Sequence, residues 1–245
     1  MRKPTVLAVV IIANSLFLFS PIVRVQATTT PLGLPMVGSD WKVENLVSQG
    51  NGNFKISASA ADTIPTGGVF FPFPNAGPSA SHPTYTSEFT IGFPLSLSAS
   101  NTITATIKIP TECAGISPCL TTMFVGNPDG SACGTVNSVR LFFQSTNTNS
   151  FETHYWWSNP TSYTITTGGT ITSVTLTAPL NGAGWSDFYG HFGDVAPYST
   201  GFAAAIQNIK TIGLSFGSGC FFANGVGVDS ATGVATFQLL EYKIT

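Results

Sequence analysis

Charged side chains are scarce in this sequence. Asp, Glu, Lys and Arg make up 8% of its 245 residues, whereas about a quarter is usual in globular chains. After residue 27, the six basic residues stand singly rather than in clusters, and binding to nucleic acid needs several Lys or Arg side chains together. We therefore expect no nucleic-acid partner. Low charge does not indicate disorder here, because 43% hydrophobic and 12% aromatic residues can form a large core.

Long apolar runs are absent after the N-terminal segment. The one such run, residues 5–19, follows Arg2 and Lys3 and precedes Val25-Gln26-Ala27, which places small residues at a cleavage site. That order is typical of a secretory signal peptide, so residues 1–27 are predicted to be removed. An uncleaved anchor is the alternative, but a membrane-spanning helix needs about 20 apolar residues. We expect a secreted, extracellular chain with no membrane span after cleavage.

Cysteine occurs only four times, as Cys113, Cys119, Cys133 and Cys220. There is no C-x₂-C pair, and no histidine lies near these cysteines in the sequence, which argues against a zinc site. In a chain predicted to enter an oxidising compartment, four cysteines favour two disulfides, for which three pairings exist. The turn-forming residues between Cys113 and Cys119 favour that local pair, with Cys133–Cys220 as the second.

Helical periodicity is confined to residues 202–209, where Phe202, Ile206 and Ile209 share one face. The rest of the chain shows short alternating segments, such as residues 102–109, separated by Asn-Pro, Gly-Gly and Asn-Gly pairs that favour turns. This pattern predicts an all-β fold, an antiparallel β-sandwich with one short helix, rather than an α/β fold. Residues 28–38 are predicted to be a linker, and residues 39–245 a single β-sandwich domain.

Prolines and glycines crowd residues 65–83 around the apolar group Val69-Phe70-Phe71-Pro72-Phe73. Proline interrupts the hydrogen bonding of a sheet, so the segment is predicted to be a long loop whose phenylalanines pack over the sandwich. An exposed loop that grips a ligand is the alternative.

The C-terminal half carries a family likeness. A short helix leads into the strand 212–217, a Gly-rich turn at 220–228 and a closing strand at 235–244, and upstream the runs 140–144 and 155–158 fit the same pattern. Residues 139–245 resemble jelly-roll domains of the galactose-binding-like type, which include many carbohydrate-binding modules. They are also similar to secreted bacterial proteins without an assigned function.

The resemblance implies jelly-roll connectivity and an extracellular glycan as the partner. Family modules often hold a structural calcium near the chain ends, where this sequence offers Asp40, Glu44 and Glu241. Three scattered carboxylates are few ligands for a metal ion, so calcium is only weakly indicated and its ligands are not assigned. We expect no other cofactor.

Two segments suggest catalysis, and neither has the context that catalysis needs. Residues 213–217 match G-x-S-x-G, but no helix signal follows and no histidine comes after His191. Asp187 and Asp194 could form the carboxylate pair of a glycoside hydrolase, with His191 between them as a possible metal ligand. Aspartate and glycine are equally ordinary turn residues, so no residue is assigned a catalytic role.

Tyr155-Trp156-Trp157 is the best candidate for a sugar platform. Successive strand residues point to opposite faces, and His154 and Ser158 share the face of Trp156. Trp156 is therefore predicted to face solvent and Trp157 the core, although all tryptophans could also be buried. An exposed indole can stack on a pyranose ring.

Further ligand contacts are predicted from the polar-aromatic run 185–194, in which we select Trp185, Asp187, Tyr189 and His191, together with His154 beside the platform. The sequence thus favours a secreted, non-catalytic, lectin-like carbohydrate-binding protein. The alternatives are a glycan-cleaving hydrolase or lyase, and a surface or matrix structural protein without a small ligand.

Overall fold

The computed structural model describes residues 31–49, 54–75, 84–113, 123–126, 137–146, 154–165, 173–217, 222, 225–229 and 233–245. The predicted signal peptide, residues 1–27, lies outside these ranges, and so do Cys119, Cys133 and Cys220. Signal cleavage and both disulfides therefore stay predictions.

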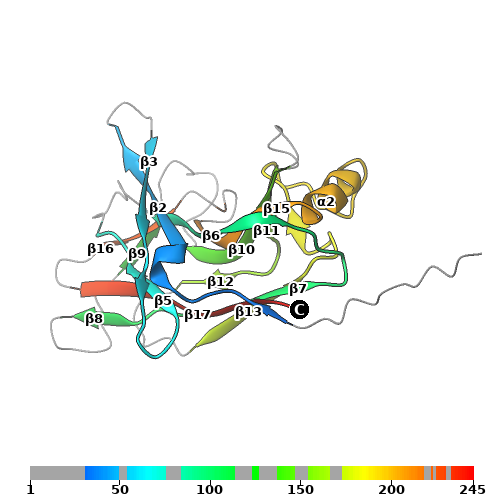
Figure 1. Cartoon of the computed structure of the whole chain (residues 1–245). Helices are drawn as coiled ribbons and strands as arrows, with labels where there is room; N and C mark the ends of the chain where they lie inside the picture. Colours follow the sequence, from blue (N-terminus) through cyan, green and yellow to red (C-terminus); the bar gives the residue numbers. More distant parts are fainter. Residues whose placement is uncertain are drawn as a thin grey trace, which may run out of the picture.

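One sheet is built around the C-terminal strand β17, which pairs with β7 on one side and β5 on the other (Figure 1). Its order is β13-β7-β17-β5-β4, and β1 and β8 also pair with β17. Its strands are β1 (Leu32–Gly33), β4 (Asp62–Thr63), β5 (Val69–Pro72), β7 (Thr102–Lys108), β8 (Thr111–Cys113), β13 (Val174–Pro179) and β17 (Gly233–Ile244).

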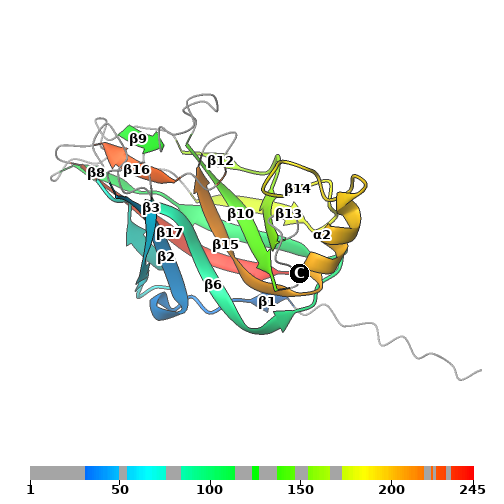
Figure 2. The same cartoon turned by 90° about the horizontal axis from the view of Figure 1, so that it is seen from above.

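The second sheet has the order β14-β11-β10-β15-β6-β16-β9, with β12 beside β10 and the β2–β3 hairpin beside β6. Figure 2 shows β10, β15 and β6 running side by side through its middle. Its strands are β2 (Trp41–Ser48), β3 (Phe54–Ala60), β6 (Thr84–Leu95), β9 (Met123–Gly126), β10 (Ser138–Ser145), β11 (Tyr155–Ser158), β12 (Tyr163–Thr164), β14 (Trp185–Ser186), β15 (Ile209–Gly217) and β16 (Val226–Asp229).

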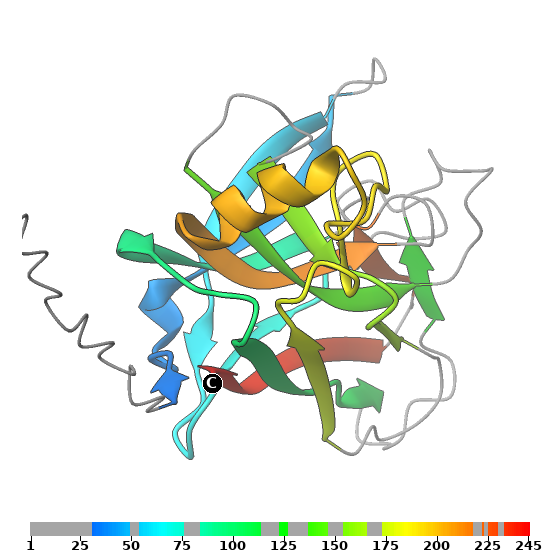
Figure 3. The same cartoon turned by 90° about the vertical axis from the view of Figure 1, so that its right-hand side faces the viewer.

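The two sheets stack as layers around one hydrophobic core (Figure 3). The ring of Phe216 on β15 lies 5.9 Å from Phe71 on β5 and 5.0 Å from Phe237 on β17, both edge to face. Such edge-to-face pairs add to the stabilisation from buried apolar area. On β7 the predicted alternation is confirmed, since Ile103, Ala105 and Ile107 are all completely buried.

The prediction of an all-β antiparallel sandwich is confirmed, because every ladder between the described strands is antiparallel. The jelly-roll connectivity stays a prediction. The helix expected at residues 202–209 is α2 (Tyr198–Ile206), and Ile209 is instead the first residue of β15. The short 3₁₀ helix η1 (Gly38–Asp40) precedes α2 in the chain. No helix in the described part of the chain has the length and apolar character of a membrane span.

Two segments are more ordered than the sequence suggests. Val69–Pro72, expected to lie in a loop, is strand β5, and Phe71 within it reaches the core as predicted. Part of the predicted linker is strand β1, where Leu32 pairs with Ile244. Pro31 precedes β1 and Pro72 is the last residue of β5, so neither proline interrupts the middle of a strand.

Candidate functional site

The tryptophans of β11 point to opposite faces of the second sheet. Trp156 was expected to face solvent, and this prediction is wrong: Trp156 is 0% exposed and belongs to the core. Its strand partner is Phe143, another core residue, and the ring of Phe202 from α2 meets it edge-on at 4.9 Å. Trp156 therefore cannot serve as a surface platform.

The polarity of Ser158 misled the prediction, because its hydroxyl is hydrogen-bonded inside the protein. The Ser158 hydroxyl accepts a hydrogen bond from the backbone N–H of Leu141 at 3.0 Å and donates one to the carbonyl of Thr161 at 2.7 Å. A serine satisfied in this way can be buried at little cost. His154 comes just before β11 begins and is half-buried against Tyr155.

Trp185, a second predicted ligand contact, is also completely buried. Its indole N–H donates to the carbonyl of Pro179 at 2.9 Å, and its ring lies 5.1 Å from Phe143. The expectation that Trp185 contacts a ligand is corrected on the same ground as that for Trp156, because a core side chain offers no accessible ring face.

Trp157 lies on the outer face of the second sheet, among aromatic side chains. Tyr155 stacks beside it with ring centroids 5.9 Å apart, and Phe188 and Phe222 lie at 6.2 and 6.3 Å. We call the residues Tyr155, Trp157, Phe188, Tyr189 and Phe222 the outer aromatic surface. Trp157 itself is covered and only 6% exposed, and its indole nitrogen is buried without a hydrogen-bond partner.

A tight turn between Asp187 and His191 carries the exposed end of this surface. Asp187 donates its backbone N–H to the carbonyl of His191 at 2.9 Å and accepts a bond from the N–H of Gly190 at 3.0 Å. Gly190 has a φ of 86°, a conformation that favours glycine. The turn directly follows β14, and Ser186 bridges to Phe192 across its base.

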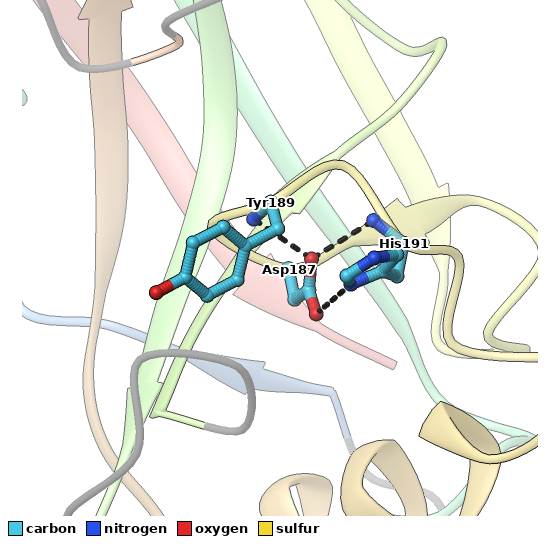
Figure 4. Close-up of polar contacts among 3 residues, drawn as sticks. All are labelled: Asp187, Tyr189 and His191. Carbon is cyan, nitrogen blue, oxygen red and sulfur yellow. Dashed lines mark hydrogen bonds and ion pairs between the residues drawn. The ribbon is translucent and has the colours of Figure 1, made fainter.

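The Asp187 carboxylate fixes the turn from inside (Figure 4). One oxygen accepts the backbone N–H groups of Tyr189 and His191, at 2.9 and 2.8 Å. The other lies 2.9 Å from Nδ1 of His191. Asp187 is only 1% exposed, so these contacts compensate a carboxylate that would otherwise be costly to bury.

The tip of the turn presents two neighbouring aromatic residues to solvent. Tyr189 is 59% exposed and Phe188 is 36% exposed, and their rings meet edge to face at 5.3 Å. On the other side, the ring of His191 stacks on Tyr198 at 3.8 Å with an interplanar angle of 5°. Exposed aromatic residues held in one rigid arrangement are typical of binding sites.

Arg140 lies on β10, beneath Phe222. The guanidinium carbon is 4.0 Å from the centre of the Phe222 ring, and Nη1 donates to the carbonyl of Ser158 at 3.1 Å. Burial lowers the pKa of Arg140 to about 10, which still leaves the side chain protonated at neutral pH. Arg140 was not selected from the sequence, since a single basic residue in a strand gives no signal.

The two catalytic interpretations gain no support from this geometry. Both Asp187 oxygens are occupied by the turn, and Asp194 lies exposed further along the loop. Ser215 of the G-x-S-x-G match sits within β15, where its hydroxyl donates to the carbonyl of Phe222 at 2.6 Å. A nucleophile elbow needs a strand-to-helix turn at the serine, and here the strand continues to Gly217.

Two of the three carboxylates suggested for calcium form ion pairs with lysines. Glu44 pairs with Lys42 at 2.6 Å and Glu241 with Lys243 at 3.1 Å, while Asp40 is exposed in η1. Among the residues that the structure describes, no group of three or more His, Cys, Asp or Glu side chains could hold a metal ion.

Comparison with known proteins gives no relative from which a function could be transferred. No family model, no curated protein and no solved structure matches this chain.

Proposed function

We propose that this protein is a secreted, non-catalytic carbohydrate-binding protein whose binding site is the outer aromatic surface. The observation that carries the proposal is the pair Phe188 and Tyr189, exposed at the tip of a turn that a buried carboxylate fixes. Turn positions usually hold small or polar residues. Two aromatic residues there expose apolar surface to water, which is unfavourable. Stacking against the C–H face of a sugar ring would bury that surface.

The construction of the turn also favours binding. A ligand that meets an already ordered surface requires less ordering of side chains, so more of the interaction energy appears as affinity. Here the Tyr189 backbone is held by Asp187, and its ring contacts both Phe188 and His191. His191 is fixed in turn by Asp187 and Tyr198. The tip is therefore preorganised through several independent contacts.

Substituting Tyr189→Ala should remove most glycan binding while leaving the fold intact. An exposed stacking residue contributes to the ligand and little to the core, so the free energy of unfolding should change by no more than about 0.5 kcal/mol. Calorimetric titration of the purified protein, with ligands first selected on a glycan array, measures the binding. Urea denaturation of the same samples measures stability.

Ile56→Ala is the matched control, because Ile56 is a comparably exposed apolar residue on β3, away from the turn. It should bind like the unmodified protein. Equal loss of binding in both variants would argue against a site at the turn. A well-folded protein that binds no glycan on the array would contradict the proposal and favour a structural role.

A further inference from the structure

Arg140 offers a hydrogen-bonding edge that the protein does not use. In the described part of the chain its guanidinium makes one hydrogen bond, from Nη1 to Ser158, and Nε is buried without a partner. The side chain is 8% exposed and has no carboxylate partner among the described residues. An unpartnered buried donor is destabilising, and more so on a charged group, so binding of an acceptor at Nε would be favourable.

A second unused donor lies in the same neighbourhood. The indole N–H of Trp157 is buried without a partner, and both Trp157 and Arg140 contact the ring of Phe222. Trp157 stands opposite Phe142 in the ladder between β10 and β11, two positions along from Arg140 on the same face. Both unsatisfied groups are donors, which points to a ligand that supplies acceptors only.

We propose that the bound glycan is acidic, and that Arg140 recognises a carboxylate of a uronic acid residue in it. Phe222 covers one face of the guanidinium, so a carboxylate would bind in the plane of the group, at the edge that carries the buried, unpartnered Nε. That edge matches the two oxygens of a carboxylate, which makes a paired, charge-assisted contact. This assignment rests on the proposed function, because the sugar rings themselves stack on Phe188 and Tyr189.

The surroundings of Arg140 favour an anion over a neutral hydroxyl group. A hydroxyl would satisfy one donor but leave the positive charge uncompensated in a partly desolvated place, where charge interactions are stronger than in water. Burial already acts against the charged form of Arg140, as its lowered pKa records. A carboxylate both compensates the positive charge and accepts hydrogen bonds from the guanidinium N–H groups.

The test compares oligogalacturonate with its methyl ester, which has the same backbone without the charge, and with a neutral galactan oligosaccharide as a further uncharged probe. Titration calorimetry measures the affinity of each probe for the unmodified protein, residues 28–245, and for its Arg140→Lys and Tyr189→Ala variants. We expect the free acid to bind at least about tenfold more tightly than the ester, which corresponds to one charge-assisted contact. Arg140→Lys keeps the charge but loses the paired edge, so the preference should fall below about threefold.

Tyr189→Ala should weaken the acid and the ester alike, because stacking does not depend on the charge. Equal affinity of the unmodified protein for acid and ester would overturn the role of Arg140 while leaving the proposed function standing. Failure to bind any probe or any array glycan would overturn both. If Arg140→Lys does not fold, the affinities of the unmodified protein for acid and ester still test the role of Arg140. Weaker binding of the acid at high salt would support a charge interaction.

Discussion

Substituting Trp156→Ala should lower the free energy of unfolding by about 3–5 kcal/mol, the cost expected when a fully buried tryptophan is truncated. Trp156 is completely buried between Phe143 on the neighbouring strand and Phe202 on α2. Removing its ring would leave a cavity where α2 packs on the second sheet. Urea denaturation, followed by tryptophan fluorescence, measures the change.

Packing around Trp156 cannot relax easily to fill that cavity. Phe202 already lies directly against the backbone of Gly193, where an added Cβ would come within 2.6 Å of its ring. The other wall belongs to β10, which is fixed by ladders with β11 and β15. A Trp156→Ala protein as stable as the unmodified one would show that Trp156 lies at the surface after all.

Asp187→Ala should cost about 3 kcal/mol of stability and also abolish glycan binding. The substitution removes the acceptor of two backbone N–H groups and the partner of His191 Nδ1, and hydrogen bonds to a charged group contribute about 1.5–3 kcal/mol each. Without the carboxylate, the backbone N–H of Tyr189 loses its hydrogen-bond acceptor, so the position of its ring is less well fixed. Urea denaturation and calorimetric titration of the same variant measure both effects.

Asp187→Asn is the matched control for this prediction. Its amide oxygen can still accept the N–H groups of Tyr189 and His191, so only the contact with His191 Nδ1 changes. We expect a smaller loss of stability and partial binding. If Asp187→Ala retained full stability and binding, the backbone bonds between Asp187, Gly190 and His191 would suffice to hold the turn.

Much of the fold follows from local pattern. The alternation in residues 102–109 predicts a half-buried strand because inward positions are all apolar, and Ile103, Ala105 and Ile107 are indeed buried. The helix is predicted by the spacing of Phe202 and Ile206, which both face the core. Its start lies four residues earlier than expected, at Tyr198, since no capping side chain marks it.

The orientation of β11 could not be deduced from local pattern. Alternation correctly separates Trp156 from Trp157, but the choice of the inner face depends on the pairing of Trp156 with Phe143, 13 positions earlier in the chain. Polarity of the neighbours misleads here because Ser158 is satisfied by Leu141 and Thr161. Strand register is set by such long-range pairing, and a single polar neighbour does not reveal it.

The candidate site was half visible in the sequence. Residues 185–194 stand out as the densest polar-aromatic run, and the roles of Asp187 and Gly190 in a turn agree with their ordinary preferences. Arg140 and Phe222 carry no such signal, because they meet only when β10 and the segment after β15 are brought together.

The indole N–H signals of the four tryptophans test the location of the site most directly. In a ¹⁵N-labelled protein titrated with the glycan, each signal reports its own surroundings, and Trp157→Phe assigns the one of interest. The Trp157 signal should shift strongly, because its ring lies against Phe188 and Phe222 of the outer aromatic surface. Those of Trp41 and Trp185, bonded to Pro35 and Pro179 in the interior, should stay unchanged. Binding that moves the Trp41 signal and leaves Trp157 unchanged would place the site elsewhere and contradict this account.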